Sequence, residues 1–211
     1  SIKLDLLPTS GNGTIRHLIL PAFTVSLSYI STYIRLIRNN MLENMKQDYV
    51  LYFGRFSKEK GVGTFVEACK ALPDIPFVAA GSGPLEGELA GIPNLKNVGF
   101  QSGEELQRLI AGARLSLCPS ECYDNCPFSV MESLMYGTPV LGADIGGIPE
   151  LIDAGVNGEL FESGNADALT EKIRALWDDH TQLDAYARAC GTTRFDTVEE
   201  YAEKLMPLYQ G

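Results

Sequence analysis

Two basic side chains bracketed by glycines form the first segment whose residue types could do chemistry. Gly54 and Arg55 begin a short loop, and Lys60 and Gly61 end it just before a predicted helix. Glycines permit close backbone approach, a helix start favours an anion, and two cations supply charge. These properties are typical of a diphosphate pocket, although the loop alone is better explained as a solvated connection. It lacks the Gly-x-x-x-x-Gly-Lys-Ser/Thr pattern, which excludes ATP hydrolysis of that type.

A second segment that could do chemistry contains two carboxylates, Asp124 and Glu132. Pro127 suits the first position of a helix, so Asp124 is expected in the loop before that helix and Glu132 more than a turn inside it. Free N–H groups at a helix start attract a phosphate or a sugar, and carboxylates accept hydrogen bonds from sugar hydroxyls. Taken singly, Asp124 reads as a helix-capping acid and Glu132 as part of a solvated helix face. Together with the dibasic loop they favour a nucleotide-sugar pocket.

Weaker candidates lie between these segments. A glycine-rich turn, Gly81 to Pro84, opens a short helix, and Phe100 ends a strand where a flat base could lie, although a core position is equally compatible. Three cysteines, Cys118, Cys122 and Cys126, recur every fourth residue. Prolines interrupt any helix there and both histidines are distant in sequence, so we expect no metal site.

The elements that must position these residues alternate between strand and helix. Strands are predicted at 50–53, 77–80, 96–100, 114–118, 139–142 and 158–161, and helices at 61–72, 85–90, 103–111, 128–136 and from 166 to near the end. Short, continuously apolar strands indicate a parallel sheet covered on both faces. The sequence therefore predicts a doubly wound α/β domain, whose ligands bind beyond the carboxyl ends of the strands.

The first 47 residues lack the alternation of strand and helix patterns and are assigned to an N-terminal extension. The α/β domain and its helical tail are assigned to 48–211. Leu27, Ile30, Ile34, Ile37 and Met41 form one apolar helical stripe. A packing helix is the preferred interpretation. Interfacial membrane contact and a membrane span are the alternatives, and the polar residues within the stretch disfavour a span.

Composition bounds the functional class. The chain has 211 residues, 45% of them hydrophobic, and a formal net charge of −10. Such an acidic chain is a poor candidate for nucleic-acid binding. The five cysteines are an odd number at uneven spacing, which favours reduced thiols, and no pattern of a secretory leader opens the sequence. We expect a cytoplasmic protein, with the inner face of the membrane as an alternative location.

Residues 49 to about 170 resemble the carboxyl-terminal, donor-binding half of retaining glycosyltransferases of the two-Rossmann GT-B class, family 4, which includes glycogen synthase and sucrose synthase. Three groups of residues carry the resemblance: the dibasic loop; the segment 120–132 followed by 136–140, similar to the family's Glu-x7-Glu and Gly-Thr-Pro-Val motifs; and the turns at 146–150 and 157–158.

The resemblance implies a role for each candidate. Arg55 and Lys60 would neutralise the donor diphosphate, Glu132 would hold the ribose, and Asp124 would face the donor sugar. No metal or other cofactor would be required. The implied catalytic residues are Asp124, Arg55 and Lys60, and the implied donor-binding residues are Gly54, Arg55, Lys60, Gly81, Ser82, Phe100 (through its backbone), Asp124, Phe128, Ser129 and Glu132.

Two substitutions and one missing part depart from the family pattern. Asp124 stands where the family usually has Glu, with Glu121 nearby as a carboxylate that could compensate, and Ser129 replaces a glycine. The acceptor-binding Rossmann domain has no counterpart in residues 1–48. The expected function is sugar transfer from a nucleotide donor to a sugar, lipid or other hydroxyl acceptor. Without the acceptor domain or a subunit that supplies it, the chain is expected to be inactive. A non-catalytic nucleotide-binding module or remnant subunit is the alternative.

Overall fold

The computed structural model describes residues 46–193, 195 and 206–207. Its centre is a six-stranded, all-parallel sheet in the order β3-β2-β1-β4-β5-β6. The strands are β1 (Val50–Arg55), β2 (Phe77–Ser82), β3 (Leu95–Asn97), β4 (Leu115–Cys118), β5 (Val140–Ala143) and β6 (Gly158–Phe161). This strand order is that of the Rossmann fold, in which successive strands are added toward one edge as far as β3 and toward the other edge from β4 onward, so that the order reverses between β1 and β4.

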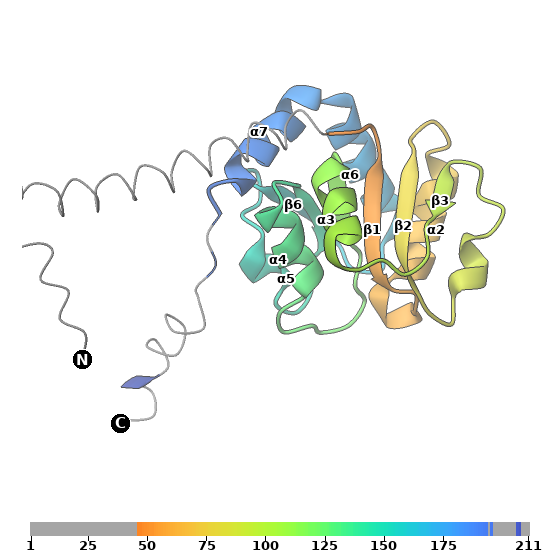
Figure 1. Ribbon diagram of the computed structural model, residues 1–211, viewed down its shortest axis with the longest axis horizontal. Helices are drawn as coiled ribbons and strands as arrows, with labels where there is room; N and C mark the ends of the chain where they lie inside the picture. The colour runs from red at the N-terminus through yellow and green to blue at the C-terminus, as the bar shows by residue number, and fades with distance from the viewer. Residues whose placement is uncertain (1–45, 194, 196–205, 208–211) are drawn as a thin grey trace, which may run out of the picture. The chain divides into compact units, whose positions relative to one another are not determined.

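Helices cover both faces of the sheet. Figure 1 shows α3 and α4 on one face and α2 and α6 on the other, with α7 continuing from α6. The helices are η1 (Lys58–Lys60), α2 (Val62–Ala71), η2 (Glu86–Leu89), α3 (Gly103–Gly112), α4 (Phe128–Met135), α5 (Ile148–Leu151), α6 (Ala166–Asp178) and α7 (His180–Cys190). The expected doubly wound α/β architecture is confirmed.

Residues 50–53 of strand β1 are continuously apolar, with no alternation of apolar and polar side chains, because both faces of the strand are buried. Tyr52 points to one face, where its ring stacks on Phe65 of α2 at a centroid distance of 4.9 Å. Leu51 and Phe53 point to the other face and pack with Ile110 of α3. Each side of the strand is therefore buried, as expected for a parallel sheet between two helical layers.

Several predicted boundaries were wrong. The helix expected from residue 166 onward is broken at Asp179, whose carboxylate accepts a hydrogen bond from the backbone N–H of Gln182 and caps α7. The strand expected at 96–100 ends at Asn97, and 86–89 form a 3-10 helix. Helix α5 was not predicted because only four residues form it. Pro127 is the N-cap of α4 rather than its first residue.

The N-terminal side of the domain is described from Lys46 onward. The Lys46 ammonium donates hydrogen bonds to the carbonyl of Ala113 at 2.8 Å and to the hydroxyl of Thr138 at 2.7 Å. The apolar stripe predicted over 27–41 lies outside the described residues, and the boundary at residue 47 stays a prediction. In the part of the chain that the structure describes, no helix has the length and apolarity needed to cross a membrane.

Candidate functional site

The carboxyl ends of β1 and β4 bring the two chemically suggestive segments together. The loop after β1 and the loop after β4 contact each other directly, since the Glu121 N–H donates to the Glu59 carbonyl at 2.9 Å. Gly61 makes this approach possible. A Cβ at that position would lie 1.7 Å from the carbonyl oxygen of Pro119, and its φ of +69° disfavours other residues. The site therefore lies at the reversal of strand order, where ligands of open α/β sheets bind.

A cavity of about 270 Å³, here called the β1–β4 cavity, opens between these loops. Both predicted cations and both predicted carboxylates border it. Its lining includes, among the predicted residues, Gly54, Arg55, Lys60, Asp124, Phe128, Ser129 and Glu132. Predicted residues that are up to 78 positions apart in the sequence (Gly54 to Glu132) thus surround one small space.

A second cavity of about 510 Å³, here called the β1–β2 cavity, adjoins the first. The two share Phe53, Gly54 and Arg55 in their linings. The remaining predicted residues, Gly81, Ser82 and Phe100, line the β1–β2 cavity. All ten residues chosen from the sequence therefore border one of two adjacent cavities, whose dimensions suit a ligand with two parts.

The β1–β2 cavity is shaped by close backbone contacts. A Cβ on Gly81 would lie 1.9 Å from the carbonyl oxygen of Gly54, and one on Gly83 would lie 2.3 Å from that of Phe56. Only residues without a side chain fit at both positions. Phe100 follows Gly99, past the end of β3, and is 72% exposed, so it stands at the cavity mouth and not in the core.

Lys60 and Asp124 form an ion pair inside the β1–β4 cavity. Burial alone lowers the pKa of Lys60, but the hydrogen bond and charge of Asp124 outweigh it and hold that pKa above its ordinary value. The same carboxylate oxygen also accepts a hydrogen bond from the Ser120 hydroxyl at 3.4 Å. Arg55, by contrast, forms no salt bridge with any residue that the structure describes.

The alternatives left open for the carboxylates can now be separated. No side chain caps the start of α4, so Asp124 is not a capping acid. Glu132 is half-buried beside the β1–β4 cavity, and this burial raises its pKa, so it is not part of a solvated helix face. The expectation that Glu121 could compensate for Asp124 is wrong, because Glu121 accepts a hydrogen bond from the Thr64 hydroxyl at 2.7 Å and does not line the cavity.

Several lining residues escaped the sequence analysis. Tyr52, Cys118 and Ser120 border the β1–β4 cavity, and Gln101 and Leu106 border the β1–β2 cavity. Cys118 and Ser120 lie at and just after the end of β4, so the rule that ligands bind beyond the carboxyl ends of strands would have selected them. Tyr52 lies in the middle of β1, where neither its position nor its residue type indicates a site.

The cysteines do not form a metal centre among the described residues. All five are free thiols, with Cys69, Cys118 and Cys190 buried and Cys126 exposed. Burial raises the pKa of Cys118 to about 11, which leaves its thiol protonated and unreactive at neutral pH. Within the described ranges, no three His, Cys, Asp or Glu side chains are grouped so that they could hold an ion.

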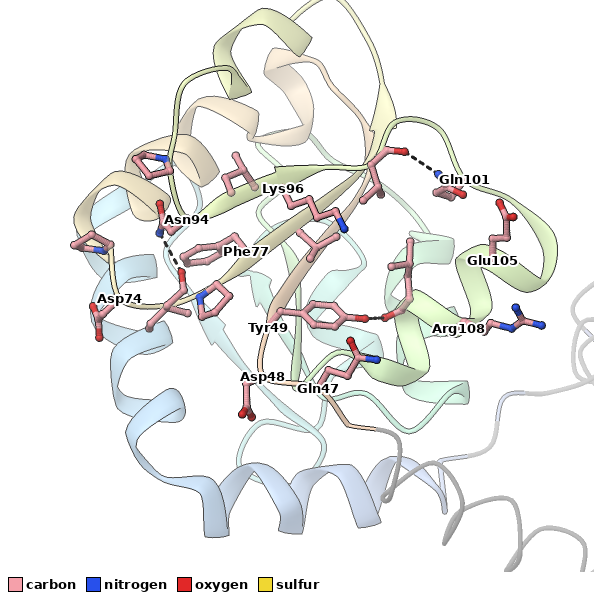
Figure 2. Close-up of a pocket in the computed structure, with 18 residues that line it drawn as sticks. Gln47, Asp48, Tyr49, Asp74, Phe77, Asn94, Lys96, Gln101, Glu105 and Arg108 are labelled. Atoms are coloured by element: carbon pink, nitrogen blue, oxygen red, sulfur yellow. Dashed lines mark hydrogen bonds between the residues drawn. The ribbon is translucent and has the colours of Figure 1, made fainter.

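A third cavity, of about 900 Å³, lies at the opposite end of the sheet, beside the amino ends of β1 and β2 (Figure 2). Its polar groups are largely engaged in the fold. The Tyr49 hydroxyl donates to the carbonyl of Leu109 at 2.6 Å, and the Asn94 amide donates to three carbonyls, one of them that of Ile75. Its lining also contains Lys96, Arg108 and three carboxylates, but it lies away from the carboxyl ends of the strands, where ligands of this fold bind. The candidate site is therefore the pair of cavities at the carboxyl ends.

The chain belongs to the family described as glycosyl transferases group 1, whose profile matches residues 34–191. It is 36% identical over 151 residues to the glycogen synthase of Myxococcus xanthus. The aligned region covers 65% of this chain and 31% of the glycogen synthase. The chain thus spans about a third of the length of the curated glycosyltransferases it matches.

A solved structure supports the fold assignment. The Anabaena protein HepE, in complex with UDP, superimposes with a TM-score of 0.68 at 22% identity, covering 82% of this chain and 51% of that chain. The HepE structure contains bound UDP. Because the two sequences are only 22% identical, the structural similarity establishes the fold of this chain and not its ligand. The domain therefore has the Rossmann-like fold of GT-B glycosyltransferases.

A short segment of the chain is also similar to a protein that is not a glycosyltransferase. A segment of 52 residues, 25% of this chain, is 42% identical to the metal-staphylopine import system permease protein CntB of Staphylococcus aureus, of which it covers 17%. Residues 1–33 lie outside the glycosyltransferase family match. The chain is therefore similar to glycosyltransferases over most of its length and to a permease over a quarter of it.

Proposed function

We propose that this chain is the nucleotide-sugar donor-binding part of a retaining glycosyltransferase of family 4. The observation that carries the proposal is the convergence of Arg55, Lys60, Asp124 and Glu132 on the β1–β4 cavity, at the edge of the sheet where ligands of this fold bind. The family match supports the reaction class. The sugar, the acceptor and the base of the donor are left open.

The two cavities divide the ligand between them. The base is placed in the β1–β2 cavity, against Gly81, Ser82 and the backbone at Phe100. The ribose lies where the cavities join, and the diphosphate and the sugar follow in the β1–β4 cavity, the diphosphate between Arg55 and Lys60 and the sugar toward Asp124. Glu132 accepts hydrogen bonds from the ribose hydroxyls. The backbone at Phe128 and Ser129, at the start of α4, approaches the sugar and the phosphate.

The protein contributes to the reaction mainly through electrostatic stabilisation of the leaving group. As the bond between sugar and diphosphate breaks, negative charge develops on the departing phosphate, and two preorganised cations and a helix start stabilise it. Arg55 and Lys60 therefore act on the leaving group without a metal ion. Asp124 positions the donor sugar. Retention at the anomeric carbon follows from the family resemblance.

A partner that binds the acceptor is part of the proposal. Transfer requires the acceptor oxygen to be held about 3–3.5 Å from the reacting carbon, and a second wall must exclude water. Phe100, Tyr123 and Phe128 are 72%, 84% and 75% exposed around the carboxyl-end loops. Such exposed aromatic side chains are typical of an interface. We assign this rim to contact with an acceptor-binding domain or subunit, in the cytoplasm or at the inner face of the membrane.

A thermal-shift screen tests the donor-binding role. The full chain is heated with UDP, GDP or ADP, each in the presence of EDTA. At 100 times its dissociation constant, a bound nucleotide adds about 2.7 kcal/mol to the free energy of unfolding, so one of the three should raise the melting temperature clearly. No shift with any of them contradicts the proposal. If a nucleotide raises the melting temperature only when EDTA is left out, the proposal that binding needs no metal ion is contradicted.

The second candidate is a nucleotide-binding module without catalysis. The observation in its favour is that the predicted residues around the two cavities are all assigned to the donor and none to an acceptor. Nucleotide binding with no transfer in the presence of every candidate acceptor subunit would favour the module over the enzyme.

A further inference from the structure

Asp124 and Lys60 occupy the β1–β4 cavity as a pair, 64 positions apart in sequence. Their side chains are 26% and 34% exposed, so water reaches both and either can exchange its partner for a ligand. Without a ligand, one of the two proposed phosphate cations is therefore already neutralised by a protein carboxylate. A phosphate that approaches Lys60 must also approach the negative charge of Asp124.

The backbone of Asp124 is held in place by its neighbours. Its carbonyl accepts a hydrogen bond from the Gly147 N–H at 2.8 Å, and its N–H donates to the Cys122 carbonyl at 3.0 Å. A Cβ on Gly146 would lie 2.8 Å from the Asp124 carbonyl oxygen, so the two loops are in close contact. The carboxylate can consequently leave Lys60 only by rotating about its own short side chain, and it stays within the cavity when it does so.

We propose that this ion pair makes the site prefer a nucleotide sugar over the bare nucleoside diphosphate, an inference that rests on the proposed donor-binding function. When Lys60 turns to the diphosphate, Asp124 loses its cationic partner and faces added negative charge. A sugar bound beyond the phosphate offers hydroxyl donors to that carboxylate, whereas a bare nucleoside diphosphate leaves it unpaired. An unpaired carboxylate beside a phosphate is unfavourable, because like charges repel and hydrogen bonds are lost. Asp124 is thus a specificity-determining residue that also weakens retention of the nucleotide product.

The test compares two ligands on two variants of the full chain. Dissociation constants for UDP and UDP-glucose are measured by calorimetry, or for the GDP or ADP pair if the thermal screen selects that base. D124N keeps the shape of the side chain and removes its charge. E121Q removes a charge from the same loop, but Glu121 contacts Thr64 and not the cavity, so it is the matched control.

D124N should bind UDP at least about fivefold more tightly than the wild type, on the scale of about 1 kcal/mol for a charged interaction near a protein surface. The affinity for UDP-glucose should stay nearly unchanged, so that the preference for the nucleotide sugar falls by about fivefold. E121Q should leave both constants unchanged. Melting temperatures of both variants check that each is folded; a merely structural role of Asp124 would change the two affinities in parallel.

Two outcomes overturn the inference and can be told apart. If the wild type binds UDP but D124N binds it equally or more weakly, or with an unchanged ratio of the two constants, the specificity role is wrong while donor binding stands. If the wild type binds no nucleoside diphosphate at all, the proposed function itself fails and the inference fails with it.

Discussion

At the scale of single residues, the two proposed phosphate cations differ in their surroundings. Lys60 is paired with Asp124 and half-buried in the β1–β4 cavity, whereas Arg55 is exposed and lines both cavities. The guanidinium can donate several hydrogen bonds in a fixed plane, so it suits a bidentate contact with phosphate, while the lysine acts as a point charge. Arg55 is therefore the better candidate for orienting the diphosphate and Lys60 for neutralising it.

Removing either cation should weaken nucleotide binding. We expect Arg55→Ala and Lys60→Ala each to cost about 1.5–3 kcal/mol of binding free energy, the scale of hydrogen bonds to charged groups. Lys58→Ala is the matched control, because Lys58 lies in the same 3-10 helix as Lys60 but lines neither cavity. Calorimetric titration with the selected nucleoside diphosphate measures all three. Wild-type affinity in both cavity variants would place the phosphate elsewhere.

Lys46 gives a prediction about pH. Burial lowers its pKa from 10.5 to about 7, and the other ionisable groups that act on it are Cys190, Arg114 and Asp184. Between these two pKa values the unfolded chain holds one more proton than the folded chain, so the free energy of unfolding rises with pH. From pH 6.5 to 8.5 this single group should add about 1–2 kcal/mol.

Lys46→Met isolates that contribution, because methionine keeps an unbranched apolar stem and cannot titrate. Urea unfolding of the wild type and the variant at several pH values gives the difference between their free energies. This difference should favour the variant most at pH 6.5 and shrink as the pH rises. A difference that is constant across this range would show that the Lys46 ammonium is not desolvated in the folded state.

At the scale of elements, the site depends on how closely two loops can approach. The loop after β1 reaches the loop after β4 only because Gly61 has no side chain, with the Pro119 carbonyl 1.7 Å from where a Cβ would be. Gly147 serves the same purpose on the other side of the β4 loop, where a Cβ would lie 2.1 Å from the Asn125 carbonyl oxygen. The β4 loop, which carries Asp124, is thus held between two glycines.

Gly61→Ala should therefore destabilise the domain by more than the cost of its backbone conformation. Gly91 offers the matched control, since its φ of +76° is similar to the +69° of Gly61 but no atom lies within 4 Å of its Cβ position. We expect Gly91→Ala to cost about 1 kcal/mol and Gly61→Ala about 2–4 kcal/mol of unfolding free energy. Chemical denaturation measures both; equal costs would show that the two loops can separate without penalty.

The sequence was informative wherever local chemistry and periodicity agreed. Continuous apolar runs such as 50–53 identified the strands, and glycines next to charges identified the loops that follow them. What could not be predicted depends on contacts between distant residues. The hydrogen bond from Thr64 to Glu121 joins α2 to the β4 loop, and no local pattern predicts that Glu121 is engaged there and not in the cavity. The break at Asp179, by contrast, has a local cause that the apolar periodicity does not reveal, because the Asp179 carboxylate accepts a hydrogen bond from the Gln182 N–H and caps α7.

At the scale of the whole molecule, we propose that the described domain supplies one wall of a cleft. It covers 51% of the HepE structure, and the chain spans about a third of its curated relatives. Binding of a nucleotide uses residues between Gly54 and Glu132, all of which the domain contains. Binding of an acceptor needs a second wall, to which we assign the exposed rim of Phe100, Tyr123 and Phe128.

We therefore expect the isolated chain to bind a nucleoside diphosphate while showing little or no sugar transfer. The pure chain is incubated with a range of nucleotide sugars and with sugar and lipid acceptors, and glycosylated products are sought by mass spectrometry. Addition of a polypeptide that carries an acceptor-binding domain is the complementary arm and should restore transfer. Turnover by the chain alone at about 1 per second or faster, an ordinary enzymatic rate, would show that this domain also holds the acceptor.

The most direct test of the central claim is a crystal structure of the chain with UDP, or with whichever of GDP and ADP stabilises it more, in the presence of EDTA. The diphosphate should lie within hydrogen-bond distance of Arg55 and Lys60, with the base in the β1–β2 cavity beside Phe100 and the ribose against Glu132. A nucleotide bound instead in the large cavity at the amino ends of β1 and β2 (Figure 2), or away from both cations, would contradict the account.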